Sequence, residues 1–334
     1  YTSEGPKDPR FVIEFDYSKI RKAGEPIKTF GGISSGPEPL KTLHNKLRKL
    51  LDKRDGKTLT ATDIADMMNL IGVCVVSGNV RRSAQIMFGE ANNEEYLDLK
   101  NYEVNPHRAE FGWTSNNSVF CDVKTDYTEA AKRTAINGEP GYFWLENAQK
   151  YGRLVDPPNW KDKKVVGCNP CAEQSLENFE LCCLVETFPA NHESKEDYLR
   201  TLKFAYLYAK SVTLLKTHNK DTNKVLLKNR RIGLSQTGIA QFLETHSIEE
   251  YREWCNSGYM TVQVYDEIYS NWLCVPKSVK TTSIKPSGTI SLLAGATPGM
   301  HYPEHDFYIR RIRIGVTSPL LEACKQANYK MEID

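Results

Sequence analysis

The sequence lacks the features that mark membrane, secreted and nucleic-acid-binding proteins. No apolar run among its 334 residues approaches the length that a helix needs to cross a bilayer. Basic and acidic residues nearly balance, for a net charge of +2, so no strongly basic surface points to nucleic acid. Nine cysteines without a regular framework suit a reducing compartment better than a secreted scaffold. We therefore expect a cytoplasmic protein that binds neither membrane nor nucleic acid.

A dinucleotide-binding signature is also absent, which disfavours a nicotinamide fold. Strand-like and helical segments alternate along the chain, and this alternation indicates an α/β class. Helical spacing of apolar residues predicts helices over 40–51, 62–71, 127–136 and 198–215. Short strands are predicted near 115–120, 141–144 and 232–234. A long helical region over 248–272 is expected to break near Gly258.

Four of the nine cysteines fall within sixteen positions, from Cys168 to Cys183. A zinc site would use two separated pairs of ligands, but adjacent cysteines such as Cys182 and Cys183 chelate one ion poorly. A thioredoxin-like exchanger would use Cys168-x-x-Cys171 with a lowered thiol pKa, although that motif belongs in a compact βαβ fold. Free cysteines also fill cores as small apolar residues. Spacing alone leaves these alternatives open.

A third interpretation groups Asn169, Cys171 and Glu173. In an extended segment, residues at i, i+2 and i+4 point to the same side, so an amide, a thiol and a carboxylate would face one substrate. Cys182 could return from the far end of the loop to offer a second thiol. Such a set suits the reductive removal of a sugar hydroxyl.

A second informative stretch is TTSIKPSGTIS at 281–291. A strand, a Pro-Ser-Gly-Thr turn and a helix start would aim backbone N–H groups and hydroxyls at one point, as in an anion site. Serine and threonine also cap helices for structural reasons, so the motif alone leaves both functions open. His301 and His305 lack a framing set of cysteines or carboxylates, and no metal site is assigned to them.

These motifs resemble those of the ribonucleotide reductases. NPCAEQ at 169–174, followed by ELCCLVETFP at 180–189, is similar to the active-site finger loop of that family. The likeness is strongest to the monomeric, adenosylcobalamin-dependent (class II) ribonucleoside-triphosphate reductases. Further similar stretches follow in the family's order: KTFGG at 28–32, SGPEPL at 35–40, GNVRRSA at 78–84, GEPG at 138–141, WLEN at 144–147, RRIG at 230–233 and KPSGT at 285–289.

The resemblance implies most of a ten-stranded α/β barrel, in a single catalytic domain over residues 1–334. Residues 168–183 would thread the barrel's centre as a finger loop. Relative to the family, an amino-terminal portion with the first redox cysteine and a carboxy-terminal tail with a cysteine pair would be missing. We therefore expect an internal fragment of the catalytic barrel.

The resemblance also implies a thiyl-radical reduction of ribonucleoside triphosphates to 2′-deoxyribonucleoside triphosphates, with adenosylcobalamin as cofactor and a thioredoxin-like or other dithiol reductant. Cys171 would carry the thiyl radical, Glu173 would act as base on the 3′-hydroxyl, and Asn169 would orient the hydroxyls. Cys182 would be one of the two reducing thiols, with its partner outside this chain. The substrate phosphates would lie against Pro286, Ser287, Gly288 and Thr289.

Two other functions stay open at this stage. One is a non-catalytic nucleotide-binding fragment that needs other segments. The other is a Cys-x-x-Cys thiol-disulfide oxidoreductase, since Cys168 has no place in the radical mechanism.

Overall fold

The computed structural model describes residues 14–28, 31–78, 83–303, 305–307, 309, 311–312, 314, 318 and 320–332. Parts of two motifs, KTFGG and GNVRRSA, lie outside these residues. The chain divides into two compact units. One unit comprises the described residues of Tyr1–Ala84, Tyr102–Thr114 and Arg313–Asp334, and the other those of Gln85–Asn101 and Ser115–Ile312.

The first unit is helical. Its elements are α1 (Glu38–Lys53), α2 (Ala61–Val76), the 3-10 helices η1 (Pro106–Glu110) and η2 (Gly112–Thr114), and α11 (Leu320–Gln326). Leu43 of α1, Leu70 of α2 and Phe111 form its buried apolar cluster. Thr60 caps α2 through a reciprocal pair of hydrogen bonds with Asp63. Both predicted helices in this unit are thus confirmed.

The second unit opens with a parallel sheet. Its strands are β1 (Gln85–Gly89), β2 (Ser115–Phe120) and β3 (Gly141–Phe143), paired in the order β1-β2-β3. The connections contain α3 (Glu94–Leu97) and α4 (Thr128–Asn137), and α5 (Leu145–Lys150) follows β3. Parallel strands joined through helices are the α/β pattern that the sequence predicts.

The rest of the second unit holds two further strand pairs. β4 (Val165–Cys168) and β5 (Ser175–Glu177) are antiparallel, whereas β6 (Leu184–Thr187) and β7 (Gly233–Gln236) are parallel. The remaining elements are η3 (Pro189–Asn191), α6 (Lys195–Val212), α7 (Lys220–Asn229), α8 (Ile239–Leu243), α9 (Ile248–Leu273) and α10 (Ile290–Ala294). The main core joins α6, α8 and α9 to β7 and the start of β6, through residues such as Tyr198, Trp254 and Leu234.

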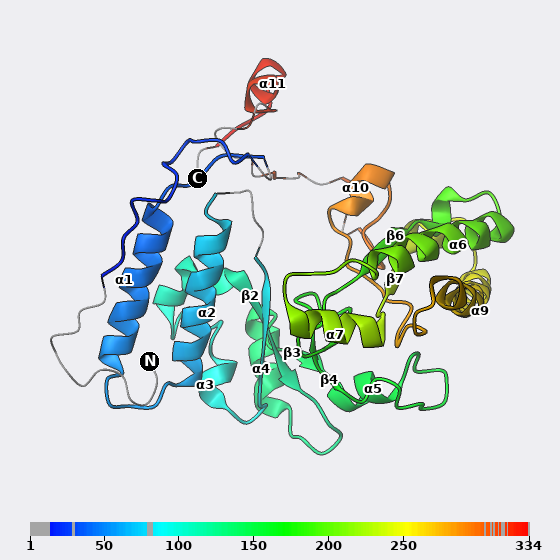
Figure 1. The fold of residues 1–334 in the computed structure, drawn as a ribbon, viewed down its shortest axis with the longest axis horizontal. Coiled ribbons are helices and arrows are strands. Elements are labelled where there is room, and N and C mark those ends of the chain that lie inside the picture. The colour runs from blue at the N-terminus through cyan, green and yellow to red at the C-terminus, as the bar shows by residue number, and fades with distance from the viewer. Residues whose placement is uncertain are drawn as a thin grey trace. The chain divides into compact units, whose positions relative to one another are not determined.

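The expected break near Gly258 is wrong, because α9 is continuous over its 26 residues. Helices α6 and α9 lie side by side (Figure 1). A Cβ atom at position 258 would lie 2.9 Å from Leu202 Cδ1 of α6. Glycine is therefore present to let two helices approach closely, and its poor helix propensity is outweighed by packing.

The described strands form three small sheets, of three, two and two strands, and they do not close into a ten-stranded barrel. The α/β class is confirmed, but the larger part of a ten-stranded barrel that the resemblance implies is not formed by the described strands. One reason is that the segment at 281–283 runs beside β7 with a single parallel bridge, Leu234 to Thr282, and so does not count as a strand.

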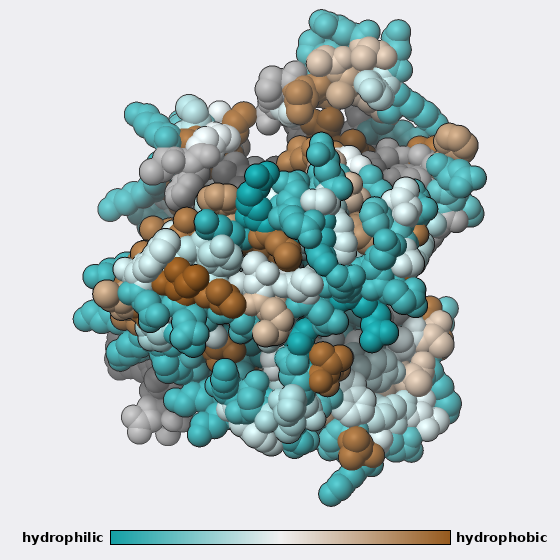
Figure 2. Space-filling model, turned by 90° about the vertical axis from the view of Figure 1, so that its right-hand side faces the viewer, coloured by the Kyte–Doolittle hydropathy of each residue, from teal (hydrophilic) through white to brown (hydrophobic). Residues whose placement is uncertain are grey.

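No helix within the described residues is both long and apolar enough to span a bilayer. The face seen in Figure 2 is mainly hydrophilic, with hydrophobic residues in small separate groups.

Candidate active site

The cysteine-rich stretch folds into a hairpin between β4 and β5. Cys168 pairs with Ser175, and residues 169–174 form the connecting loop. The loop is closed by the backbone N–H of Asn169, 3.0 Å from Gln174 O, and by the N–H of Gln174, 3.0 Å from Asn169 Oδ1. Ala172 adopts a left-handed conformation with φ of 62°. The predicted extended alternation over 169–173 is therefore wrong, since a tight turn replaces it.

The turn nevertheless brings the predicted thiols and carboxylate together. Cys171 and Cys182 are both exposed residues, whereas the side chain of Glu173 is only 2% exposed. The charges of Glu173 and Lys285 both act on the pKa of Cys171 and on that of Cys182. Cys182 thus returns to the side of Glu173, as expected from the length of the loop.

The surroundings keep these thiols protonated. Although Cys171 and Cys182 are exposed as residues, partial burial of their thiol groups and the Glu173 carboxylate raise the pKa of Cys171 above its ordinary value. The same two causes raise the pKa of Cys182 to about 12. Burial likewise raises the pKa of Cys168 to about 12. Disulfide exchange requires a thiolate, which a Cys-x-x-Cys motif obtains by lowering a thiol pKa. The electrostatics therefore disfavour the oxidoreductase alternative and suit thiols that give up hydrogen atoms.

Asn169 and Glu173 differ in how their polar atoms are used. The amide oxygen of Asn169 accepts the Gln174 N–H, which leaves its NH₂ group as the part suited to orient a ligand hydroxyl. Both carboxylate oxygens of Glu173 are buried, and neither accepts a hydrogen bond from the described residues. A buried acceptor without a donor is costly, so this carboxylate is suited to receive a hydroxyl from a substrate.

The Pro-Ser-Gly-Thr stretch joins the same site through its leading segment. Ser283 donates a hydrogen bond from Oγ to the backbone oxygen of Glu173, at 2.7 Å. Ser287 is buried and left-handed, with φ of 54°, whereas Gly288 and Thr289 are exposed. The predicted helix start is confirmed, because α10 begins at Ile290 directly after the turn. Residues 286–289 therefore form a turn that is exposed only at Gly288 and Thr289, and it follows the segment bound to Glu173.

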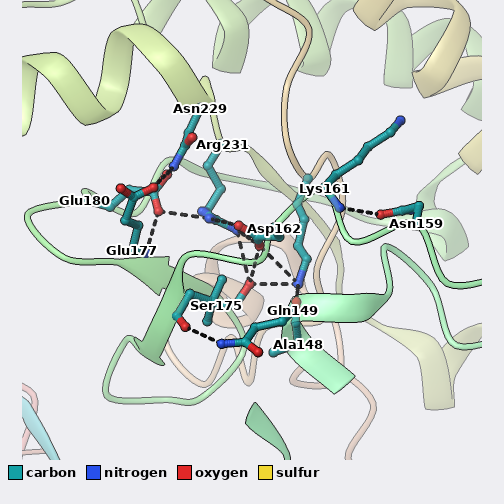
Figure 3. A network of polar contacts seen from close by, with 12 residues as sticks. Ala148, Gln149, Asn159, Lys161, Asp162, Ser175, Glu177, Glu180, Asn229 and Arg231 are labelled. Carbon is teal, nitrogen blue, oxygen red and sulfur yellow. Dashed lines mark hydrogen bonds and ion pairs between the residues drawn. The ribbon is translucent and has the colours of Figure 1, made fainter. Parts of the chain in front are cut away.

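A buried network of charges holds the base of the hairpin and was missed by sequence reasoning. Arg231, with a fully buried side chain, lies between Asp162 and Glu180 (Figure 3). Its Nη2 atom is 2.7 Å from Asp162 Oδ1 and 2.9 Å from Glu180 Oε2. Lys280 donates to Ser175 Oγ at 2.9 Å and lies 3.3 Å from Asp162 Oδ2. The network thus ties both limbs of the hairpin to the segments around β7.

RRIG at 230–233 was the only signal for this network, through the resemblance. Nothing in the spacing of Asp162, Glu180 and Lys280 shows that they converge. Clusters of three or more histidines, cysteines or carboxylates able to hold a metal ion do not occur in the described part of the chain.

Comparisons with known proteins show which proteins the whole chain is similar to. No family model matches the sequence. A probable adenosylcobalamin-dependent ribonucleoside-triphosphate reductase of Dictyostelium discoideum is 58% identical over 319 residues, 95% of this chain and 42% of that protein. The adenosylcobalamin-dependent ribonucleoside-triphosphate reductase of Euglena gracilis is 56% identical over 96% of this chain and 44% of its own length.

The solved structure of a B-12 dependent (class II) ribonucleotide reductase matches 95% of this chain with a TM-score of 0.81 at 34% identity. The chain belongs to the class II ribonucleotide reductase family. It spans 42–44% of the length of these two curated relatives and 47% of the matched class II chain. The α subunit of a class Id ribonucleotide reductase of Actinobacillus ureae, at 17% identity and a TM-score of 0.50, shares the fold.

In this chain the Glu173 carboxylate acts on the pKa values of both Cys171 and Cys182, and Asn169 closes the loop that carries Cys171 and Glu173. Residues 286–289 follow from the segment that is bonded to Glu173. The chemical roles of these residues, which follow from the family resemblance, remain predictions.

Proposed function

We propose that this chain contains the catalytic core that reduces ribonucleoside triphosphates to 2′-deoxyribonucleoside triphosphates by a thiyl-radical mechanism. The observation that carries the proposal is the convergence of two protonated thiols, Cys171 and Cys182, on the buried Glu173 carboxylate without a hydrogen-bond donor. The curated relatives that match the chain are named as reductases of this type.

Cys171 is assigned to start and finish the reaction on the substrate. A thiyl radical on its sulfur takes the 3′-hydrogen of the ribose, which restores the thiol and leaves a carbon radical. Glu173 accepts the proton of the 3′-hydroxyl while Asn169 holds the hydroxyls in place. At the end of the reaction Glu173 returns the proton to the 3′-oxygen, the Cys171 thiol returns a hydrogen atom to the 3′-carbon, and the thiyl radical is recovered.

Cys182 is assigned to the reduction at the 2′-carbon. The 2′-hydroxyl leaves as water after it takes a proton, and two thiols supply two electrons and become a disulfide. Cys182 would be one of these thiols. A thioredoxin-like protein or another dithiol would then reduce the disulfide. The raised pKa of Cys182 favours this role, since a protonated thiol supplies the proton together with the electron.

Adenosylcobalamin fits this chain through Cys171. Its thiol is protonated and belongs to an exposed residue in the hairpin turn, so a radical formed outside the loop can reach it. When bound, the cofactor would supply the organic radical that takes the hydrogen atom of a thiol. The contribution of the chain is to present that one thiol while it keeps Glu173 dry.

The proposal also includes the barrel architecture that the family resemblance implies. We propose that the chain forms most of a ten-stranded α/β barrel, with residues 168–183 as its central finger loop and one catalytic domain over 1–334. The match of 95% of the chain to a class II reductase structure supports this proposal.

A single-turnover assay tests the proposed function. The protein is mixed with adenosylcobalamin, a dithiol and a ribonucleoside triphosphate, and deoxynucleotide is quantified beside Cys171→Ser and the control Cys324→Ser. Cys324 lies in α11, in the other compact unit. We expect product from the wild type and the control and none from Cys171→Ser. No product from any variant, with nucleotide binding intact, would favour the non-catalytic nucleotide-binding alternative.

A further inference from the structure

The Glu173 carboxylate faces a cation that the mechanism above does not use. Lys285 Nζ lies 3.6 Å from Glu173 Oε1, and the Glu173 side chain is 2% exposed. This distance is too long for a direct hydrogen bond, which agrees with the absence of a donor to either oxygen among the described residues. The two groups are thus an ion pair in which the carboxylate lone pairs accept no hydrogen bond from the described residues.

The backbone of Lys285 is fixed on both sides. Its N–H donates to Ser235 Oγ at 2.9 Å, which ties it to β7. A Cβ atom on Gly299 would lie 2.5 Å from the backbone oxygen of Lys285, so only glycine there allows this close approach. The ammonium group is therefore presented to Glu173 from a rigid attachment, directly before the turn at 286–289.

Charged groups near Glu173 have opposite effects on the pKa values of the neighbouring thiols. Its carboxylate raises the pKa values of three thiols, Cys168, Cys171 and Cys182. Lys285 opposes this effect at Cys171 and Cys182, and Arg231 opposes it at Cys182. Lys285 is the cation that also forms an ion pair with Glu173 itself.

We propose that Lys285 is a positioning residue that keeps Glu173 ionised and aimed at the substrate hydroxyl. The inference rests on the proposed role of Glu173 as base. A buried carboxylate with neither a donor nor a cation would take up a proton, and a protonated Glu173 cannot accept the 3′-hydroxyl proton. The 3.6 Å separation lets Lys285 stabilise the charge without occupying the lone pairs that the hydroxyl needs.

Carbon-13 NMR of the ligand-free protein tests the inference directly. Glutamate is labelled at its side-chain carboxyl carbon, and the Glu173 signal is assigned by its loss in Glu173→Gln. In Lys285→Met we expect the Glu173 carboxylate to take up its proton at a higher pH than in the wild type, whereas Lys285→Arg should behave as the wild type. The matched control is Lys195→Met, because Lys195 is 28% exposed against 33% for Lys285 and pairs with the distant Glu253.

A second measurement uses turnover. The acid limb of the single-turnover rate against pH should move to higher pH in Lys285→Met and stay in place in Lys285→Arg and Lys195→Met. An unchanged Glu173 titration in Lys285→Met, or an equal shift in Lys285→Arg, would overturn the inference. Absence of deoxynucleotide from the wild type in the single-turnover assay would instead count against the proposed function, and the NMR measurement would still decide the role of Lys285.

Discussion

Three neighbouring thiols, Cys168, Cys171 and Cys182, are held in their protonated form. Burial and the Glu173 carboxylate act in the same direction on each of them. A protonated thiol is a poor nucleophile but a competent donor of hydrogen atoms, so the raised pKa values support the proposed hydrogen-atom transfer over disulfide exchange. Cys168 lies in the same environment but has no role in the proposed reaction. Its buried position in β4 is explained by packing as a small apolar residue.

Alkylation rates follow from these pKa values. At pH 8 the thiolate of Cys182, with its pKa of about 12, is scarce, and we expect alkylation about 10- to 100-fold slower than that of a small free thiol. The rate should keep rising with pH well beyond the ordinary range of cysteine near 8.5. Peptide-resolved mass spectrometry after timed iodoacetamide treatment measures this. Full alkylation of Cys182 within the time of the free thiol would contradict the expectation.

The raised pKa of Cys182 also predicts how the free energy of unfolding changes with pH. Because the folded state holds the Cys182 proton more tightly than the unfolded state, this thiol stabilises the fold fully below a pH of about 8.5. Its contribution should be lost as pH rises toward about 12. In urea unfolding as a function of pH, Cys182→Ala should lose less stability than the wild type between pH 8 and pH 10. Equal losses in the two proteins would be evidence against the raised pKa.

At the scale of elements, the hairpin between β4 and β5 depends on a buried set of charges. Asp162 precedes β4, Ser175 begins β5, Glu180 follows β5, and Arg231 and Lys280 contact them from around β7. Opposite charges balance within this set, which is the condition under which buried ions are tolerated. The position of Cys171 and Cys182 relative to each other therefore depends on buried charges from outside the loop that connects β4 and β5.

Arg231→Met should strongly destabilise the protein. It leaves the carboxylates of Asp162 and Glu180 buried without their shared partner, and the expected loss is about 3–5 kcal/mol in urea unfolding. Lys228→Met is the matched control, because its side chain is 45% exposed and pairs with Glu177 at the surface. The control should cost no more than about 1 kcal/mol. A loss below about 1 kcal/mol for Arg231→Met would show that the network does not hold the hairpin.

A substitution at Gly233 of β7 tests how closely this strand packs against the loop at 169–174. A Cβ atom there would lie 2.2 Å from Gln174 Oε1 and 2.5 Å from Leu184 Cδ2. Gly233→Ala should therefore cost about 1–3 kcal/mol and displace Gln174, whereas Gly288→Ala, with open space around the added methyl group, should be near neutral. Differential scanning calorimetry compares the two variants. Equal melting temperatures would mean that β7 and the turn are not packed this tightly.

The helices of this chain could be predicted from local patterns, but the turn could not. Apolar spacing located α1, α2, α4 and α6, because a stripe of apolar residues is sufficient to define a buried helix face. The hairpin at 169–174 depends on the Asn169 side chain closing the loop and on the left-handed Ala172, which periodicity does not reveal. Continuity of α9 through Gly258 likewise depends on a partner helix far away in sequence.

At the scale of the whole molecule, the candidate residues were found through motifs, and their grouping came from the fold. Asn169, Cys171, Glu173 and Cys182 are near one another in sequence, so the family motif located them. Lys285 and Arg231 come from segments more than 45 residues away from this loop, and no local pattern ties them to Glu173 or Glu180. Long-range charge pairing is the part of the site that one sequence leaves unspecified.

Electron spin resonance tests the central claim, that Cys171 carries the radical, most directly. The protein is frozen rapidly after mixing with adenosylcobalamin and a ribonucleoside triphosphate, and the wild type is compared with Cys171→Ser and Cys182→Ser. We predict a radical signal in the wild type and in Cys182→Ser, since Cys182 acts after the radical has formed, and no signal in Cys171→Ser. An equal signal in Cys171→Ser, or none in any of the three proteins while they still bind nucleotide, would contradict the account.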